Sequence, residues 1–203
     1  RVPLYVRSSV ASAEGDVLSS VMEILADQIL QLVPESAVLS QVSVHSFQGL
    51  AQDVSVLTSV WEWCAEHGQM ARFAPLSFAL AQALSWVGLV GQQADCLERA
   101  LTLIPKDNPY VPHLVLVWGA AMETRAVPET ILVRIAPLLE QTLPADVRLG
   151  CLRLAAQLNG HCGQIDTSLA LADEAMALAE ATGNRDVLLR LSTMALGQSV
   201  LWQ

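Results

Sequence analysis

The chain has 203 residues, of which 53% are hydrophobic and only 15% are charged, and its formal net charge is −9. This apolar content argues against disorder, because burial of apolar side chains offsets the loss of chain entropy. The negative charge repels nucleic-acid phosphates and anionic lipid surfaces, so we expect no direct nucleic-acid contact by this segment.

The N-terminal part predicts three helices. The first runs from about Asp16 to Leu32, where apolar residues recur at helical spacing. Pro34 opens a second helix, through about Leu50, because proline is favoured in the first turn. Asp53 is expected to cap a third helix, which ends at Gly68 in the C′ position. Residues 1–70 are therefore expected to form a helical segment, either a cap or earlier degenerate repeats.

An uncharged stretch from residue 73 to residue 91 is long enough to be tested as a membrane span. It is interrupted by four residues, namely Pro75, Ser77, Gln82 and Ser85. We therefore expect a buried helix of the fold rather than a transmembrane helix, and no membrane partner.

Turn glycines and alanines in the remaining chain recur at a fixed spacing. Gly88 lies at an expected helix–helix turn, with Ala100 twelve residues later and Pro105 five residues after that. Gly163 and Ala175 repeat the spacing of twelve residues. A poorer copy between them has small residues or proline at Gly119, Ala120, Ala136 and Pro144. Such a period is typical of stacked repeats.

This pattern resembles the tetratricopeptide repeat, whose units of about 34 residues carry a turn glycine, a later alanine and a terminal proline. The resemblance implies a repeat domain over residues 71–203, with units at about 74–107, 113–146 and 149–182 and a final helix at 184–203. The fold it implies is all-α. It is a right-handed superhelical stack of antiparallel helix pairs, a tetratricopeptide-like α-solenoid with about ten helices.

The segment ALADEAMALAEATGNRD, residues 170–186, is similar to the helical-repeat segments of large bacterial transcriptional regulators. Those are the maltose-activator and antibiotic-regulatory activator types, in which the repeats follow a nucleotide-binding switch domain and sense a ligand or partner. Within this segment Ala172, Ala175 and Ala179 share one helix face. Small side chains let a second helix approach closely, so we expect Ala175 at the tightest contact.

In tetratricopeptide-like arrays the first helix of each unit lines a concave surface, and the resemblance implies which residues face it here. They are Phe78, Gln82 and Trp86 in the first unit, Val117, Ala121 and Arg125 in the middle unit, and Arg153, Gln157 and His161 in the third. A groove with these aromatic and arginine side chains would suit a peptide that carries apolar side chains and an acidic group. The alternative is that these are ordinary packing residues between units.

The sequence shows no glycine-rich phosphate loop, no nucleophile elbow and no metalloprotease motif. His161, Cys162 and Asp166 are close in sequence, but adjacent residues rarely present two ligands to one ion, so we interpret them as a repeat turn. Glu62 and Glu66 share a helix face and are interpreted as a solvated acidic face rather than an acid–base pair. No metal or cofactor is expected.

Two further residue types bear on burial. Trp61 and Trp63 point about 200° apart on a helix, so we expect one in the core and the other exposed or between units.

Four cysteines form no CxxC pair and are interpreted as small buried side chains of a reducing, cytoplasmic protein; they are Cys64, Cys96, Cys151 and Cys162.

The sequence thus predicts a non-catalytic helical-repeat scaffold that binds a protein or a peptide, as the sensor or interaction part of a bacterial transcriptional regulator. A helical domain that closes around a small-molecule effector is the first alternative. An all-α enzyme of unrecognised type is the second. Self-association of the chain stays open.

Overall fold

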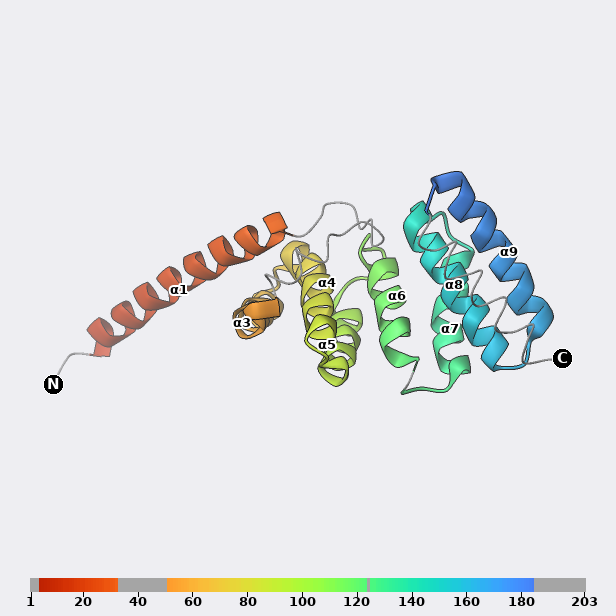
Figure 1. The fold of residues 1–203 in the computed structure, drawn as a ribbon. Coiled ribbons are helices and arrows are strands. Elements are labelled where there is room, and N and C mark those ends of the chain that lie inside the picture. The colour runs from red at the N-terminus through yellow and green to blue at the C-terminus, as the bar shows by residue number, and fades with distance from the viewer. Residues whose placement is uncertain (1–3, 33–50, 124, 185–203) are drawn as a thin grey trace.

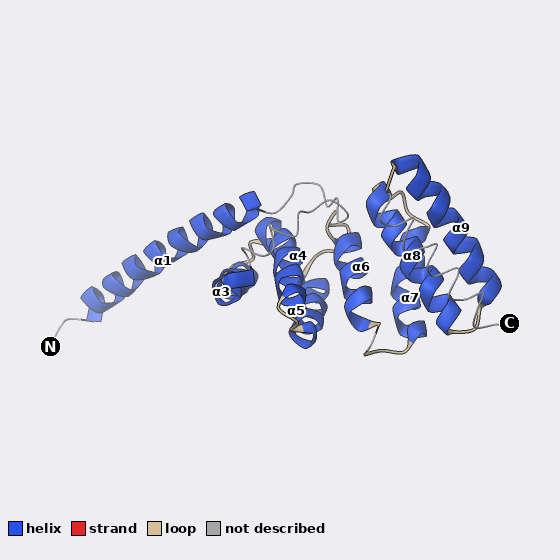
Figure 2. Cartoon of the chain, in the orientation of Figure 1, coloured by secondary structure: helices blue, strands red, loops and turns tan. Residues whose placement is uncertain are grey.

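The computed structural model of the protein describes residues 4–32, 51–123 and 125–184, with side chains from Val17 onward. Every regular element in these residues is a helix (Figure 2), so the predicted all-α class is confirmed for them. The predicted helices over 34–50 and beyond Asn184 lie outside the described residues, so a total of about ten helices stays a prediction. The described helices are α1 (Leu4–Leu32), α3 (Val54–Glu66), α4 (Met70–Trp86), α5 (Val90–Leu103), α6 (Val111–Met122), α7 (Pro128–Leu139), α8 (Ala145–His161) and α9 (Ile165–Thr182).

The start of the first helix differs from the prediction, whereas the helix expected after Asp53 begins there. Helix α1 begins at Leu4 instead of Asp16. Gly15 lies inside α1, and a glycine inside a helix costs only about 1 kcal/mol relative to alanine, which a long helix can offset. Asp53 does occupy the N-cap position of α3, yet its side chain makes no capping hydrogen bond. Its backbone carbonyl instead accepts the amide of Leu57 at 3.0 Å.

Glycines end several of the helices, as predicted for Gly68, Gly88 and Gly163. Their φ angles are +66°, +78° and +74°, in the left-handed region that side chains disfavour. In each turn the amide of the residue after the glycine donates back to the helix; Leu89, for example, donates to the carbonyl of Leu84 at 2.9 Å. This arrangement is the Schellman motif, which reverses the chain within a few residues.

The helices follow one another in chain order (Figure 1), and α1 projects from the N-terminal end of the row. From α3 to α9 each helix packs against the next. In addition α4 contacts α6, and α6 contacts α8, whereas α5, α7 and α9 have no comparable contact with one another. The three hairpins α4/α5, α6/α7 and α8/α9 therefore stand side by side, with α4, α6 and α8 in one layer.

Helix α4 explains the uncharged stretch that begins at residue 73. Every residue from 73 to 81 is buried, because α4 is surrounded by α1, α3, α5 and α6. The Trp61 ring of α3 stacks on Phe73 at 5.3 Å between centroids, and its indole N–H donates to the Ser77 hydroxyl at 2.8 Å. Trp63 is buried as well, stacked on His67. Of the two positions expected for the second tryptophan, exposed or between units, the exposed one was wrong.

Small residues set the spacing between α6, α7 and α8. A Cβ atom at Gly119 would lie 2.9 Å from a Leu154 methyl group and 3.0 Å from an Ile135 methyl group. Ile135 is fully buried, and Ala136 next to it is exposed. The sequence offered Gly119 and Ala120 on the first helix and Ala136 on the second as the small residues of this hairpin. Of these three residues only Gly119 is buried in the contact, which leaves room for bulky Ile135 on the second helix.

The α8/α9 contact has the predicted alanine face. Ala172, Ala175 and Ala179 are all buried, and the latter two pack with Leu149 and Leu152 of α8. Ser168 continues the same face, and its hydroxyl donates to the backbone carbonyl of Ala156 at 2.7 Å. The expectation that these alanines face a neighbouring helix is confirmed.

Arginine side chains join successive hairpins on the side of the second helices. The Arg134 guanidinium of α7 lies 4.2 Å from the ring of Trp118 and donates to Glu98 of α5 at 3.1 Å. Arg99 repeats the arrangement one hairpin earlier, 4.9 Å from the ring of Trp61 and 4.0 Å from Glu62. Such exposed ion pairs contribute little free energy, so their main effect is to orient neighbouring helices.

Helix α1 is attached to α4 by a bidentate ion pair. Arg72 donates from Nε to one oxygen of Asp27 at 2.8 Å and from Nη2 to the other at 3.1 Å. The hydrogen bonds from Arg72 lower the pKa of Asp27. Ala26, fully buried beside this pair, places the same face of α1 against the core.

The alanine face yields a first prediction. Ala175→Leu adds three heavy atoms to a contact that has no space for them, and overpacking of this kind costs about 1–3 kcal/mol. The free energy of unfolding in urea should fall by that amount. Ala177→Leu on the exposed face of the same helix is the matched control and should leave stability nearly unchanged. Equal midpoints for the Ala175 variant and the parent would contradict the contact.

The glycine contact yields a second prediction. Gly119→Ala should destabilise the protein by about 1–3 kcal/mol, because Leu154, Ile135 and Ile131 would all have to move. Gly91→Ala is the control: it lies in α5, exposed, with nothing closer to an added Cβ than Arg125 Nη1 at 3.9 Å. Its better helix propensity should raise stability by up to about 1 kcal/mol. In urea unfolding, the change in the free energy of unfolding should have opposite signs for the two variants. The same sign for both would refute the tight contact.

Candidate functional site

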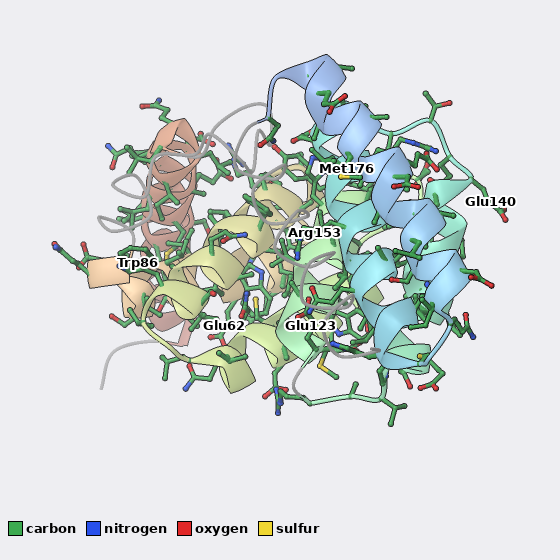
Figure 3. The ribbon with its side chains drawn as sticks, turned by 45° about the vertical axis from the view of Figure 1, so that its right-hand side comes forward. Glu62, Trp86, Glu123, Glu140, Arg153 and Met176 are labelled. Carbon is green, nitrogen blue, oxygen red and sulfur yellow. The ribbon has the colours of Figure 1, made fainter. Side chains whose placement is uncertain are left out.

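The predicted groove residues lie on or directly after the first helices. Phe78, Gln82 and Trp86 are on α4, Arg125 follows α6, and Arg153, Gln157 and His161 are on α8. In Figure 3, Arg153 and Glu123 lie toward the middle of the molecule, and Trp86 lies at its edge. The side chains are thus spread along the layer of α4, α6 and α8 and do not converge on one point.

Phe78 belongs to the contact between α4 and α6. Its side chain is only 2% exposed, and its ring meets His113 edge to face at 6.5 Å between centroids. The Tyr110 ring lies 6.0 Å from the same histidine. Val117 and Ala121 of α6 are buried too. For these three groove residues the structure favours the alternative given above, packing between units.

His113 is the titratable group at the centre of this contact. Burial lowers its pKa, and the carboxylate of Asp146 in the first turn of α8 partly opposes that shift. The imidazole is therefore neutral in the folded protein at neutral pH. No sequence motif pointed to His113, since a single histidine on an apolar helix carries no pattern.

Side-chain hydrogen bonds join the residue after α6 to α8. The Gln157 amide nitrogen donates to Glu123 at 3.1 Å, and Arg153 donates to the Gln157 oxygen at 3.4 Å. Both polar ends of the Gln157 carboxamide are thus engaged, which satisfies a side chain that is half-buried. Sequence reasoning missed Glu123. It precedes Gln157 by 34 residues, which is about one repeat length, and a search for partners at that distance would have found it.

Arg125 makes a second contact between hairpins. It is exposed, and its Nη1 donates to the backbone carbonyl of Gly91 at 3.3 Å, again 34 residues away. Gln82 on α4 is half-buried. Trp86 at the C-terminal end of α4 is 50% exposed. Arg125 and Trp86 are therefore the most accessible of the predicted arginine and aromatic side chains.

The cysteine thiols are poorly suited to nucleophilic chemistry. Burial raises the pKa of Cys96 and of Cys151 to about 12, and it also raises that of Cys64. The pKa of Cys162 is raised by burial and by the nearby Glu129 carboxylate. A protonated thiol is a weak nucleophile. Within the residues that the structure describes, no cluster of three or more His, Cys, Asp or Glu side chains could hold a metal ion, and His161 is exposed.

Comparisons with protein families, with characterised proteins and with solved structures found no match to this chain. Among the described helices, none has both the length and the apolar character needed to cross a membrane. Any assignment of function therefore depends on the residues and contacts themselves.

The buried histidine gives a prediction about pH. Because the folded pKa of His113 lies below its unfolded value of about 6.5, the folded state binds fewer protons, so stability is complete above that pH and declines as pH falls through it. We expect unfolding in urea to show this decline between about pH 7.5 and pH 5.5. His113→Phe should flatten it, while His161→Gln, at an exposed position, should not. An unchanged decline in His113→Phe would exclude this origin.

Proposed function

We propose that the chain is a non-catalytic, tetratricopeptide-like helical-repeat scaffold that binds another protein or a peptide. The observation that carries the proposal is a set of hydrogen bonds between residues about one repeat apart. Two of them join residues separated by 34 positions and one joins residues separated by 36: Gly91–Arg125, Glu123–Gln157 and Glu98–Arg134. Residues at a constant separation meet when units of equal length stack regularly.

The helix contacts support the repeat units as well. The hairpins α4/α5, α6/α7 and α8/α9 agree in number and order with units at about 74–107, 113–146 and 149–182. Contacts among α4, α6 and α8, without comparable contacts among α5, α7 and α9, favour a stack that curves toward its first helices. Solenoids use such a concave layer as an extended surface for partners.

The setting of this scaffold follows from two observations. The likeness of residues 170–186 to regulator repeats makes it the interaction or sensor part of a bacterial transcriptional regulator. All four cysteines are free thiols, three of them buried, which fits a reducing, cytoplasmic compartment. The raised thiol pKa values support a role in binding rather than in catalysis.

The proposal is tested by affinity capture from a bacterial lysate with mass spectrometry. We expect the wild-type chain to retain a specific protein, and the variant Gln82→Ala/Arg153→Ala on the first helices to lose it. The control Gln92→Ala/Arg99→Ala removes the same residue types from the second helix α5 and should retain it. All three proteins should share a circular dichroism spectrum and melting temperature within a few degrees.

Two outcomes would contradict the scaffold. Equal retention by both variants would mean that the layer of first helices does not form the contact. A small molecule that remains bound in native mass spectrometry, with no protein retained, would instead support the effector-binding alternative.

A further inference from the structure

The turn between α4 and α5 is an exposed apolar surface. All residues from Ser85 to Gln92 are exposed, directly after the fully enclosed part of α4. Four large apolar side chains close together in sequence have exposed fractions between 38% and 50%: Trp86, Val87, Leu89 and Val90. Soluble proteins rarely expose a contiguous apolar group of this kind unless it contacts a partner.

The turn itself does not need apolar residues. The described residues contain the same turn three more times, with His67 and Gln69 around Gly68, with Cys162 and Gln164 around Gly163, and with Thr182 and Asn184 around Gly183. In all four turns the residue after the glycine donates its amide to a helix carbonyl at 2.9 Å. Glutamine occupies the position of Leu89 in two of the other turns, so the turn does not require an apolar side chain there. The apolar side chains of the α4–α5 turn are thus not explained by the geometry of the turn.

Arg125 adds a positive charge beside this turn. Its Nη1 contacts the Gly91 carbonyl in the first turn of α5, and a guanidinium offers five N–H donors in all. Four other arginines, at positions 72, 99, 134 and 148, contact a carboxylate within 4.0 Å. No such pair with Arg125 occurs among the described residues. The first turn of α5 contains no acidic residue either.

We propose that the α4–α5 turn and Arg125 together dock a segment of another protein in which bulky apolar side chains stand next to a carboxylate. The apolar side chains cover Trp86, Leu89 and Val90, and the carboxylate pairs with the Arg125 guanidinium in a bidentate geometry. This inference rests on the proposed function and names its partner chemistry. It adds to the layer of first helices a contact at the edge where Trp86 lies in Figure 3.

The partner chemistry follows from charge. The chain is strongly acidic overall, which disfavours acidic partners at most of its surface. Residues 73–94 carry no charge, and Arg125 is a charged side chain that hydrogen-bonds to the backbone of this turn region. A basic partner would be repelled by the Arg125 guanidinium at this turn. A purely apolar partner would leave the guanidinium without a carboxylate. A segment with both an apolar and an acidic part satisfies both groups.

The test uses fluorescein-labelled synthetic peptides that alternate Leu or Phe with Glu or Asp, measured by fluorescence anisotropy on the full chain. Matched peptides replace Glu with Gln and Asp with Asn. We expect the acidic peptides to bind and the amide peptides to bind about tenfold more weakly or worse. Trp86→Ser and Arg125→Gln should each weaken binding of the acidic peptides by a similar factor of about ten. The controls Val56→Ser and Arg99→Gln alter an exposed valine and an exposed arginine elsewhere and should not weaken it.

Several outcomes would overturn the inference. One is that no acidic peptide binds, or that the amide peptides bind equally well. Another is binding unaffected by Trp86→Ser and Arg125→Gln but lost in Gln82→Ala/Arg153→Ala, which would leave the scaffold function standing at the first-helix layer. A third is a dimer in sedimentation velocity that Trp86→Ser dissociates, which would identify a second copy as the occupant. Melting temperatures of the variants establish that each is folded.

Discussion

The close approach of neighbouring helices through small side chains is the constraint on which this fold depends. No single hairpin has enough apolar surface to form a core alone, so each must be covered by the next. At α8/α9 the small residues lie on the second helix, as Ala172, Ala175 and Ala179. At α6/α7 the small residue is Gly119 on the first helix, opposite bulky Ile135. Both contacts are therefore close, although the small residue lies on the second helix at α8/α9 and on the first helix at α6/α7.

Polar contacts then fix the register between hairpins. The bonds from Arg125 to Gly91 and from Gln157 to Glu123 are individually weak, but each joins one hairpin to the next. Their presence affects where a partner can bind. Gln157 is engaged within the protein and Phe78 is buried, so much of the expected groove serves to hold the stack together. Among the predicted groove residues that stay accessible, Trp86 and Arg125 both lie at the α4–α5 turn.

Much of the fold could be predicted from the sequence because helix ends and buried faces leave local signals. Gly68, Gly88 and Gly163 marked turns correctly, since a left-handed backbone almost requires glycine. The alanine face of α9 was evident from helical spacing alone. Other features depend on which helices meet in space. The burial of both Trp61 and Trp63 reflects α3 being covered on two sides, by α1 and α4, which no local pattern encodes.

The candidate site was harder to predict for the same reason. Positions transferred from the repeat resemblance named Gln157 but not Glu123, its partner, and named Phe78 without its burial against His113. Side-chain accessibility depends on residues one and two units away in the chain. The exposed apolar turn was likewise hidden in the sequence, because Trp86–Val90 continues the uncharged stretch whose first part is core.

Hydrogen exchange measured by mass spectrometry tests the stacked arrangement most directly. If each hairpin is stabilised by its nearest neighbours, Gly119→Ala should speed exchange most in α6, α7 and α8 and leave α3, which has no comparable contact with these helices, close to wild type. A uniform increase of exchange across all helices would contradict it, because that is the response of a single cooperative core rather than of a stack of units.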